Sequence, residues 1–145
     1  MHLVGQRRLA LDRERAWQAL NDPAILQAAI PGCESLEKTG DNEYAVVMVS
    51  SLGPVKARFR GRLRLENVVF LESYTLRFEG EGAAAGFAKG AADVKLSGDG
   101  DGTLLDFRAD AQVGGRLAQV GSRLIDPAAG KLVDDFFAAF EGMVR

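Results

Sequence analysis

Few residues in this sequence could carry out chemistry on a bound molecule. The sequence holds one histidine, His2, and one cysteine, Cys33. His2 stands at the beginning of the chain, where we expect it in solvent, and without a second histidine or a cysteine pair an ordinary zinc site is excluded. Cys33 follows a predicted helix end, and we expect a half-buried structural thiol there.

The serines and carboxylates form no recognisable catalytic set. Ser50, Ser51 and Ser122 lack a base that the sequence places beside them, which disfavours a hydroxyl nucleophile. Asp106 and Asp110 share the outward side of a predicted strand, where we expect them to pair with arginines at the surface. We therefore predict no catalytic residue, no metal ligand and no covalently held cofactor, and we do not expect an enzyme.

The glycine-rich segment at 80–86 superficially resembles a phosphate-binding loop. It lacks the third glycine at the dinucleotide spacing, and the residues that follow it, 87–96, form a predicted strand where such a loop needs a helix N-terminus. We exclude nucleotide binding and expect a flexible connection at this place.

One surface feature stands out, a row of cations along a predicted strand. Between residues 55 and 65 apolar or small residues alternate with five cations, and side chains on a strand alternate between its two faces. The register is therefore fixed, because a slip by one residue would bury all five. We call these residues the basic stripe: Lys56, Arg58, Arg60, Arg62 and Arg64.

Two interpretations of the basic stripe stay open. It is either a solvated sheet face partly neutralised by Glu79, Asp106 and Asp110, or a docking surface for an acidic partner or anionic lipid headgroups. Nucleic acid is not an expected partner, because no aromatic residues stand between these cations and the formal net charge is -2.

Length and composition indicate one globular domain over residues 1–145. The hydrophobic share of 47% is ordinary for a globular protein. The first residues lack the apolar core of a signal peptide, and no apolar run approaches the ~18 residues of a membrane span. We expect a cytoplasmic protein, with peripheral contact at the inner face of the cell membrane as an open addition.

Periodicity and turn residues predict the order of the elements. We expect a first strand at 2–11, a helix at 13–20 capped by Asp12, and a second helix from Asp22 and Pro23 to residue 30. Further strands follow at 33–38, 44–50, 55–69, 72–80, 87–96 and 104–113. Helix occupies the rest, with a kink or break at Pro127 and an apolar stripe of Leu117, Val120, Leu124, Ala128, Leu132, Phe136 and Phe140.

A half-buried sheet must cover its apolar face, and the C-terminal helix is the longest element available to do so. The predicted fold is therefore α+β: a curved antiparallel sheet of six to seven strands wrapped on that helix, a helix-grip architecture. We expect Gly61 to bend or bulge its long strand. Many inward positions are small, which fits either close packing or a cavity between helix and sheet.

Several segments resemble the family of CoxG, the G subunit of carbon monoxide dehydrogenase. They are DPAIL at 22–26, IPGCESL at 30–36, VKARF at 55–59, GFAKGAA at 86–92 and GGRLAQVGSR at 114–123. The resemblance covers essentially the whole chain and implies a START-like (SRPBCC) fold that binds lipids or polyketides. It makes the cavity an expected feature, lined by Phe59, Leu63, Leu76, Phe78, Phe87, Phe107, Leu117, Val120, Gly121, Leu124 and Phe136.

The resemblance also implies a role and a partner. Family members are accessory proteins of the molybdenum carbon monoxide dehydrogenase, which they recruit to the membrane, and they are linked to binding of a respiratory quinone. Many carry an apolar tail after the domain, which the sequence up to Arg145 does not contain, so a tail-less member and a shortened chain are both open.

Three hypotheses of function follow. The first is a non-catalytic carrier whose cavity binds a quinone or lipid and opens by movement near Pro127 or at 80–86. The second is a docking module that uses the basic stripe without any ligand. The third, a cyclase or aromatase, requires polar groups that converge in the cavity, where the expected residues are nearly all apolar.

Overall fold

Alternating apolar and polar residues build one large sheet, which the computed structural model describes together with four helices over residues 1–52 and 54–144. The strands are β1 (His2–Leu9), β2 (Cys33–Gly40), β3 (Glu43–Leu52), β4 (Val55–Val69), β5 (Ser73–Glu81), β6 (Phe87–Asp99) and β7 (Gly102–Gly114). The helices are α1 (Arg13–Leu20), α2 (Pro23–Ala29), α3 (Arg116–Gln119) and α4 (Ser122–Val144), with a short 3-10 helix at Ala83–Ala85.

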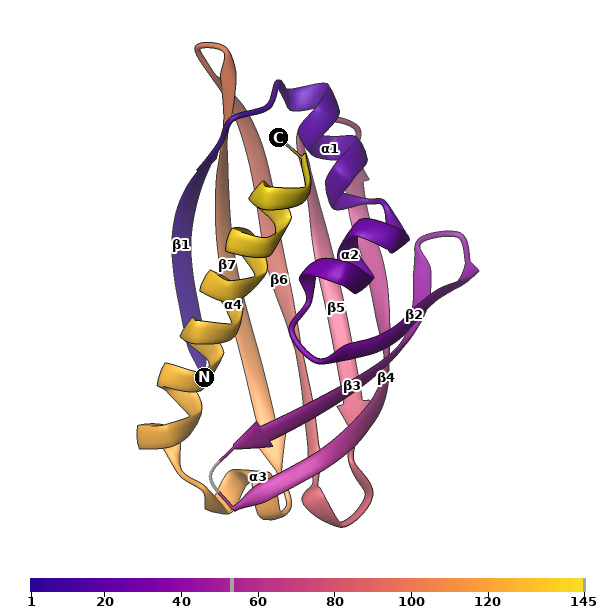
Figure 1. The fold of residues 1–145 in the computed structure, drawn as a ribbon, viewed down its shortest axis with the longest axis vertical. Coiled ribbons are helices and arrows are strands. Elements are labelled where there is room, and N and C mark those ends of the chain that lie inside the picture. The colour runs from indigo at the N-terminus through magenta and orange to yellow at the C-terminus, as the bar shows by residue number, and fades with distance from the viewer. Residues whose placement is uncertain (53, 145) are drawn as a thin grey trace.

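The seven strands form a single antiparallel sheet in the order β1-β7-β6-β5-β4-β3-β2. The sheet is curved, and α1, α2 and α4 all lie on one side of it (Figure 1). The predicted α+β helix-grip fold is confirmed. Among the described residues, no helix is both long and apolar enough to cross a lipid bilayer.

The long strand β4 alternates as expected, with its cations exposed and the residues between them turned inward. The bulge expected at Gly61 is wrong: Gly61 pairs in register with Val46 and Gly80, and the irregularity lies between Glu66 and Val69. Gly61 serves the curvature in another way. A Cβ atom there would lie 2.0 Å from the carbonyl oxygen of Glu79, so this close approach of β4 and β5 requires glycine.

The two N-terminal helices begin at the caps that the sequence indicates. The Asp12 carboxylate accepts a hydrogen bond from the Arg15 amide at 2.8 Å, and the Asp22 carboxylate accepts one from Ala24 at 2.9 Å. Pro23 takes the first position of α2, where its missing N–H costs nothing.

The break in the C-terminal helical region is not at Pro127, as expected, but between α3 and α4. Gly121 adopts a φ of +89°, a left-handed conformation that favours glycine, and α4 then runs unbroken through Pro127. Pro127 has no backbone N–H, so the Arg123 carbonyl four residues earlier lacks its helical hydrogen bond. Because both residues are exposed, water can bind that carbonyl instead.

This break also changes which face of α4 is buried. Ile125, Phe137 and Phe140 are buried, while Leu124 and Leu132 of the predicted stripe are 49% and 38% exposed. The expected stripe carried its three- and four-residue spacing across residue 121, where the turn at Gly121 separates α3 from α4.

The main core lies under the C-terminal half of α4. Phe140 is fully buried, and Phe137 stacks on Phe107 of β7 with 6.1 Å between ring centroids. From α1, Trp17 meets Tyr74 of β5 edge-to-face at 5.5 Å. The C-terminal half of α4 is thus held by aromatic packing, which contributes beyond its buried area.

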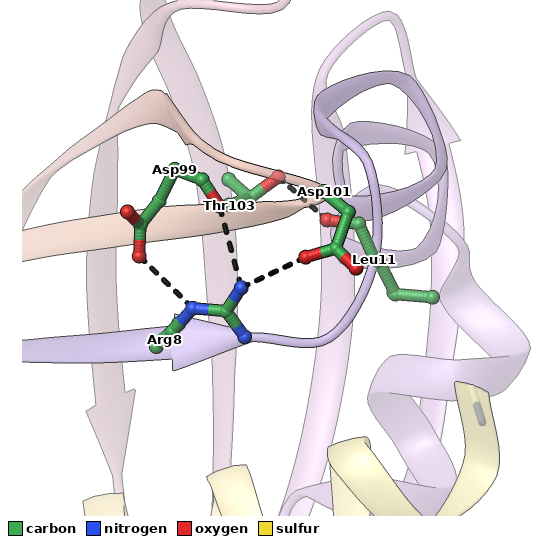
Figure 2. Close-up of polar contacts among 5 residues, drawn as sticks. All are labelled: Arg8, Leu11, Asp99, Asp101 and Thr103. Carbon is green, nitrogen blue, oxygen red and sulfur yellow. Dashed lines mark hydrogen bonds and ion pairs between the residues drawn. The ribbon is translucent and has the colours of Figure 1, made fainter.

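The end of β1 is joined to the β6–β7 hairpin by polar contacts (Figure 2). The Arg8 guanidinium pairs with Asp99 at 2.9 Å and with Asp101 at 3.2 Å. Deeper, the fully buried Thr103 hydroxyl donates a 2.8 Å hydrogen bond to the carbonyl of Leu11. The first strand was predicted to reach residue 11 but ends at Leu9. The hydrogen bond holds Leu11 against the hairpin, where the chain has left the strand and α1 has not yet begun.

We expect Thr103→Val to lower the free energy of unfolding by about 1–2 kcal/mol, because the Leu11 carbonyl would lose its donor in a buried place. Urea denaturation measures the loss. Thr75→Val, which removes a surface hydroxyl bonded to Asp93, is the matched control and should change stability by less than about 0.5 kcal/mol. Equal losses in the two variants would contradict the buried bond.

Gly61 and Gly80 face each other across β4 and β5 and offer a matched pair of substitutions. Gly61→Ala should cost about 1–3 kcal/mol, because its Cβ meets the backbone of Glu79. At Gly80 a Cβ would lie 3.8 Å from the nearest atom, so Gly80→Ala should be neutral or slightly stabilising. Chemical denaturation measures the free energy of unfolding of both variants. A Gly61→Ala protein as stable as the Gly80→Ala protein would refute the close approach of β4 and β5 at Gly61.

Candidate functional site

A cavity of about 430 Å³ lies between the concave face of the sheet and the N-terminal half of α4. β3, β4 and β5 supply most of its sheet wall. The apolar and small residues that line it are Met1, Pro31, Val46, Met48, Leu52, Val55, Phe59, Gly61, Leu63, Phe78, Gly80, Ala88, Leu117, Ile125, Ala128, Ala129 and Leu132. A larger depression of about 560 Å³ lies on the outer face, but charged residues such as Arg62, Arg77 and Glu79 line it. We take the apolar cavity as the candidate site, because ligand sites are mostly apolar.

Small side chains make this space. The helix wall presents Ala128 and Ala129, whereas the next turns of α4 carry the phenylalanines of the main core. Gly80 and Ala88 are similarly small on the sheet. The cavity and the core are therefore two ends of one helix–sheet interface, separated by side-chain size.

Four of the residues predicted to line a cavity do so: Phe59, Leu63, Phe78 and Leu117. Three others, Leu76, Phe107 and Phe136, pack against the main core instead. The sequence shows that all seven face inward or lie on the helix, but not which end of the sheet each one reaches.

The remaining four predicted residues lie outside the cavity for a common reason. Phe87 and Leu124 are 40% and 49% exposed, and Val120 and Gly121 form the link between α3 and α4. All four belong to segments whose direction depends on turns at Gly86, Gly115 and Gly121, each with a positive φ.

Sequence reasoning missed the contributions of β3 and of the first turns of α4. The alternation Tyr44, Val46, Met48, Ser50 and Leu52 was available as a signal for β3. For α4 the predicted apolar stripe already contained Ala128 and Leu132, whereas the positions of Ile125 and Ala129 follow from the helix phase after Gly121.

The polar side chains of the lining gather at one edge. Ser50 and Ser51 come from the end of β3, and Lys131 and Asp135 from the facing side of α4. Ser51, Lys131, Leu132 and Asp135 are exposed, and so is Met1 beside β1, so the cavity opens to solvent along α4. Glu79 also borders the space, and its side chain follows the outward alternation of β5.

The basic stripe lies on the outer face; Glu79 stands opposite Arg62 in the register, as the neutralised interpretation expects, but the ion pairs of the stripe are with other carboxylates. Arg58 pairs with Glu34, which raises the pKa of the guanidinium and lowers that of the carboxyl. Arg64 lies 3.7 Å from both Glu43 and Glu66. Within the described ranges 1–52 and 54–144, the other three members, Lys56, Arg60 and Arg62, have no ion pair within 4.0 Å.

Asp106 and Asp110 are surface charges, as predicted, but their polar partners among the described residues are not the expected arginines. Both lie on β7, three strands from β4, and pair with the neighbouring edge strand. Gln6 donates to Asp106 at 2.7 Å, and the His2 ring lies 2.5 Å from Asp110.

The titratable groups of the interior are structural in character. Burial raises the pKa of the Tyr74 and Tyr44 phenols, so they stay protonated even at alkaline pH where an exposed tyrosine would ionise. Cys33 is half-buried, donates to the Ser35 carbonyl at 3.4 Å, and has a pKa raised by burial, which disfavours the reactive thiolate. The described residues contain no group of three side chains placed to hold a metal ion.

The segment at 80–86, where we expect a flexible connection, contains a compact turn. Gly80 and Glu81 complete β5, and the Gly82 amide donates to the Gly86 carbonyl at 2.8 Å. Gly82 is buried against the ring of Phe59, where a Cβ would lie 2.6 Å from the ring edge.

Solved structures share this architecture. A conserved protein from Geobacillus kaustophilus is 28% identical, with a TM-score of 0.93 over 99% of this chain and 95% of that one. Zhui aromatase/cyclase from Streptomyces sp. R1128 is 12% identical with a TM-score of 0.69, covering 99% and 93%. Ara h 8.0201 is 13% identical with a TM-score of 0.66, covering 99% and 97%. The last two show the helix-grip fold alone.

Comparison by sequence gives a more specific result. No curated protein matches the chain. The family model for CoxG, the G subunit of carbon monoxide dehydrogenase, matches residues 5–144. Because this match spans nearly the whole sequence, the chain belongs to the carbon monoxide dehydrogenase CoxG family.

Proposed function

We propose that this protein is a non-catalytic carrier that binds a long hydrophobic ligand, a quinone or a lipid, and serves carbon monoxide dehydrogenase as an accessory. The observation that carries the proposal is the apolar cavity of about 430 Å³ between α4 and the sheet. Its volume falls in the range of small-molecule sites, roughly 300–1,000 Å³. Membership of the CoxG family and the helix-grip neighbours support a ligand-binding accessory role.

The chemistry of the cavity wall supports binding without reaction. Its deep part is formed by aromatic and aliphatic side chains such as Phe59, Phe78 and Leu63. A cyclase of the same fold would need an acid and a base converging on the ligand. The polar side chains stand at the exposed edge of the cavity instead, so an apolar ligand can be held by burial of its surface, at about 25 cal/mol per Å².

The partner and its docking surface form the second part of the proposal. The family name points to carbon monoxide dehydrogenase as the enzyme that this chain would serve. Arg60 and Arg62 on the outer face have no carboxylate within 4.0 Å among residues 1–52 and 54–144, which favours a docking role for this part of the basic stripe. The same cations would attract anionic headgroups and support peripheral membrane contact.

Filling the cavity from the sheet side tests ligand binding. Gly80 lines the cavity with room for a Cβ, so Gly80→Leu should place its side chain in the ligand's space without displacing backbone. We expect the affinity for a neutral apolar dye such as Nile red to fall by about tenfold or more, measured by fluorescence titration. Gly98→Leu adds the same side chain in open space at the hairpin and should leave the affinity unchanged.

Native mass spectrometry of protein purified from membrane-containing lysate provides a second readout. We expect a lipid-sized adduct on the wild type that the Gly80→Leu protein lacks. Wild-type protein that carries no adduct and binds neither the dye nor an added quinone would overturn the carrier proposal. A docking module without a ligand would then be the better explanation.

Charge reversal tests the docking surface. Arg60→Glu with Arg62→Glu should weaken binding to purified carbon monoxide dehydrogenase by about tenfold or more in surface plasmon resonance at low salt. Lys95→Glu with Arg108→Glu makes the same change of net charge on the same face, along β6 and β7, and should have little effect. Equal weakening by both pairs would show a response to net charge alone and contradict a specific surface.

A further inference from the structure

Three consecutive large apolar residues are exposed at the turn between β4 and β5. Val68, Val69 and Phe70 are 42%, 46% and 70% exposed, and no other run of this kind occurs in residues 1–52 and 54–144. We call these three residues the apolar tip. It lies at the α1 end of the sheet, whereas the cavity lies toward α3 (Figure 1). Single exposed apolar side chains are ordinary on a protein surface, but a contiguous group of them marks an interaction site.

The residues on both sides hold the apolar tip in one conformation. Asn67 and Leu71 adopt φ values of +52° and +66°, a left-handed conformation that is rare for leucine. The Leu71 side chain packs against the main core, and the Glu72 amide donates a 2.9 Å hydrogen bond to the Val69 carbonyl. Backbone strain of this kind persists only where the surrounding structure enforces it, and it concentrates at functional sites.

Phe70 is the residue of the tip best placed to act as an anchor. Its ring meets Trp17 of α1 edge-to-face, with 6.0 Å between ring centroids, and Trp17 is itself buried. The core thus fixes one edge of the Phe70 ring while most of the residue faces solvent. An aromatic side chain held in this way loses little conformational freedom when it enters a pocket, so more of its burial contributes to affinity.

The charges beside the apolar tip favour one kind of occupant. Residues 65–76 contain two carboxylates, Glu66 and Glu72, and no lysine or arginine. Glu66 pairs with Arg77, and residues 12–15 at the start of α1 add two carboxylates and two guanidinium groups. A segment that inserts into an anionic lipid surface combines apolar residues with a surplus of cations, which this region does not offer. A two-fold contact between two copies would bring the same carboxylates of both chains together. An apolar pocket bordered by basic residues, on another protein, fits both the tip and its flanks.

We propose that the apolar tip is a second contact with carbon monoxide dehydrogenase, in which Phe70 enters an apolar pocket bordered by basic residues. This inference rests on the proposed function, because it takes the same partner. Arg62 and Val69 stand on the same strand, about 23 Å apart along it, and an interface of about 800 Å² per partner can cover both. The basic stripe then attracts the partner, and the tip holds it.

Surface plasmon resonance with purified carbon monoxide dehydrogenase tests the anchor. Phe70→Ser should weaken binding by at least about tenfold, nearly all of it through faster dissociation, because the contact forms only in the docked complex. The ratio between variant and wild type should change little when salt is raised. The charge reversal at Arg60 and Arg62 should instead slow association and lose its effect in high salt.

Two further variants separate the anchor from a general loss of apolar surface or of stability. Val68→Ser leaves the contact between Phe70 and Trp17 in place and should weaken binding by about threefold. Phe87→Ser is the matched control: it removes the same side chain at an exposed position at the start of β6, toward the α3 end, and should bind like the wild type. Urea denaturation shows that each variant is folded.

Wild-type affinity in the folded Phe70→Ser protein would overturn the inference, and so would an equal loss in Phe87→Ser. Two other assays cover the alternative occupants. Phe70→Ser should leave unchanged both the binding to vesicles of phosphatidylcholine and phosphatidylserine in equal parts and the sedimentation velocity of the protein. A loss of vesicle binding would assign the tip to a lipid surface, and a dimer that dissociates would assign it to a second copy; either result overturns the enzyme contact. If the wild type itself does not bind the enzyme, the docking part of the proposed function fails as well, which separates that failure from the others.

Discussion

The aromatic packing under the C-terminal half of α4 fixes the position of this helix on the sheet, and the shape of the cavity depends on that position. Phe136, Phe137 and Phe140 pack against one another and against the sheet, and Phe140 is fully buried. Arg7 of β1 adds a polar tether, since its guanidinium pairs with Asp134 and lies 5.4 Å from the ring centroid of Phe137. Because this half of the helix is held, the direction of the other half is set as well.

The cavity is a consequence of that arrangement and of side-chain size. Where the helix carries Ala128 and Ala129, the curved sheet opposite does not fill the remaining space. Gly61 lets β4 and β5 approach each other more closely than any residue with a Cβ would allow, which fits a sheet that bends around the helix. A site built this way needs no movement of the core to exist, and its volume depends on a few small residues.

Inner and outer faces of the same strands serve different purposes. Along β4 the inward residues Phe59 and Leu63 meet the cavity, while Arg60 and Arg62 between them face solvent. The fixed alternation of the strand couples the two surfaces, because a shift in its pairing register would move the residues of both faces at once. An accessory protein that holds a ligand inside and meets a partner outside can therefore use one strand for both, as we propose.

Much of this protein could be predicted from sequence alone, because periodicity and turn chemistry are local. The bounds of α1 and β4, the caps at Asp12 and Asp22, a helix-grip fold of six to seven strands and the family could all be inferred in advance. So could the outward direction of the basic stripe. The tertiary structure decided what depends on contacts between distant segments. It placed the helix break at Gly121 instead of Pro127 and Glu34 beside Arg58, and it assigned inward residues such as Phe107 to the core and Phe78 to the cavity. Local pattern shows which face a side chain occupies, but the partner across that face is set by the path of the whole chain.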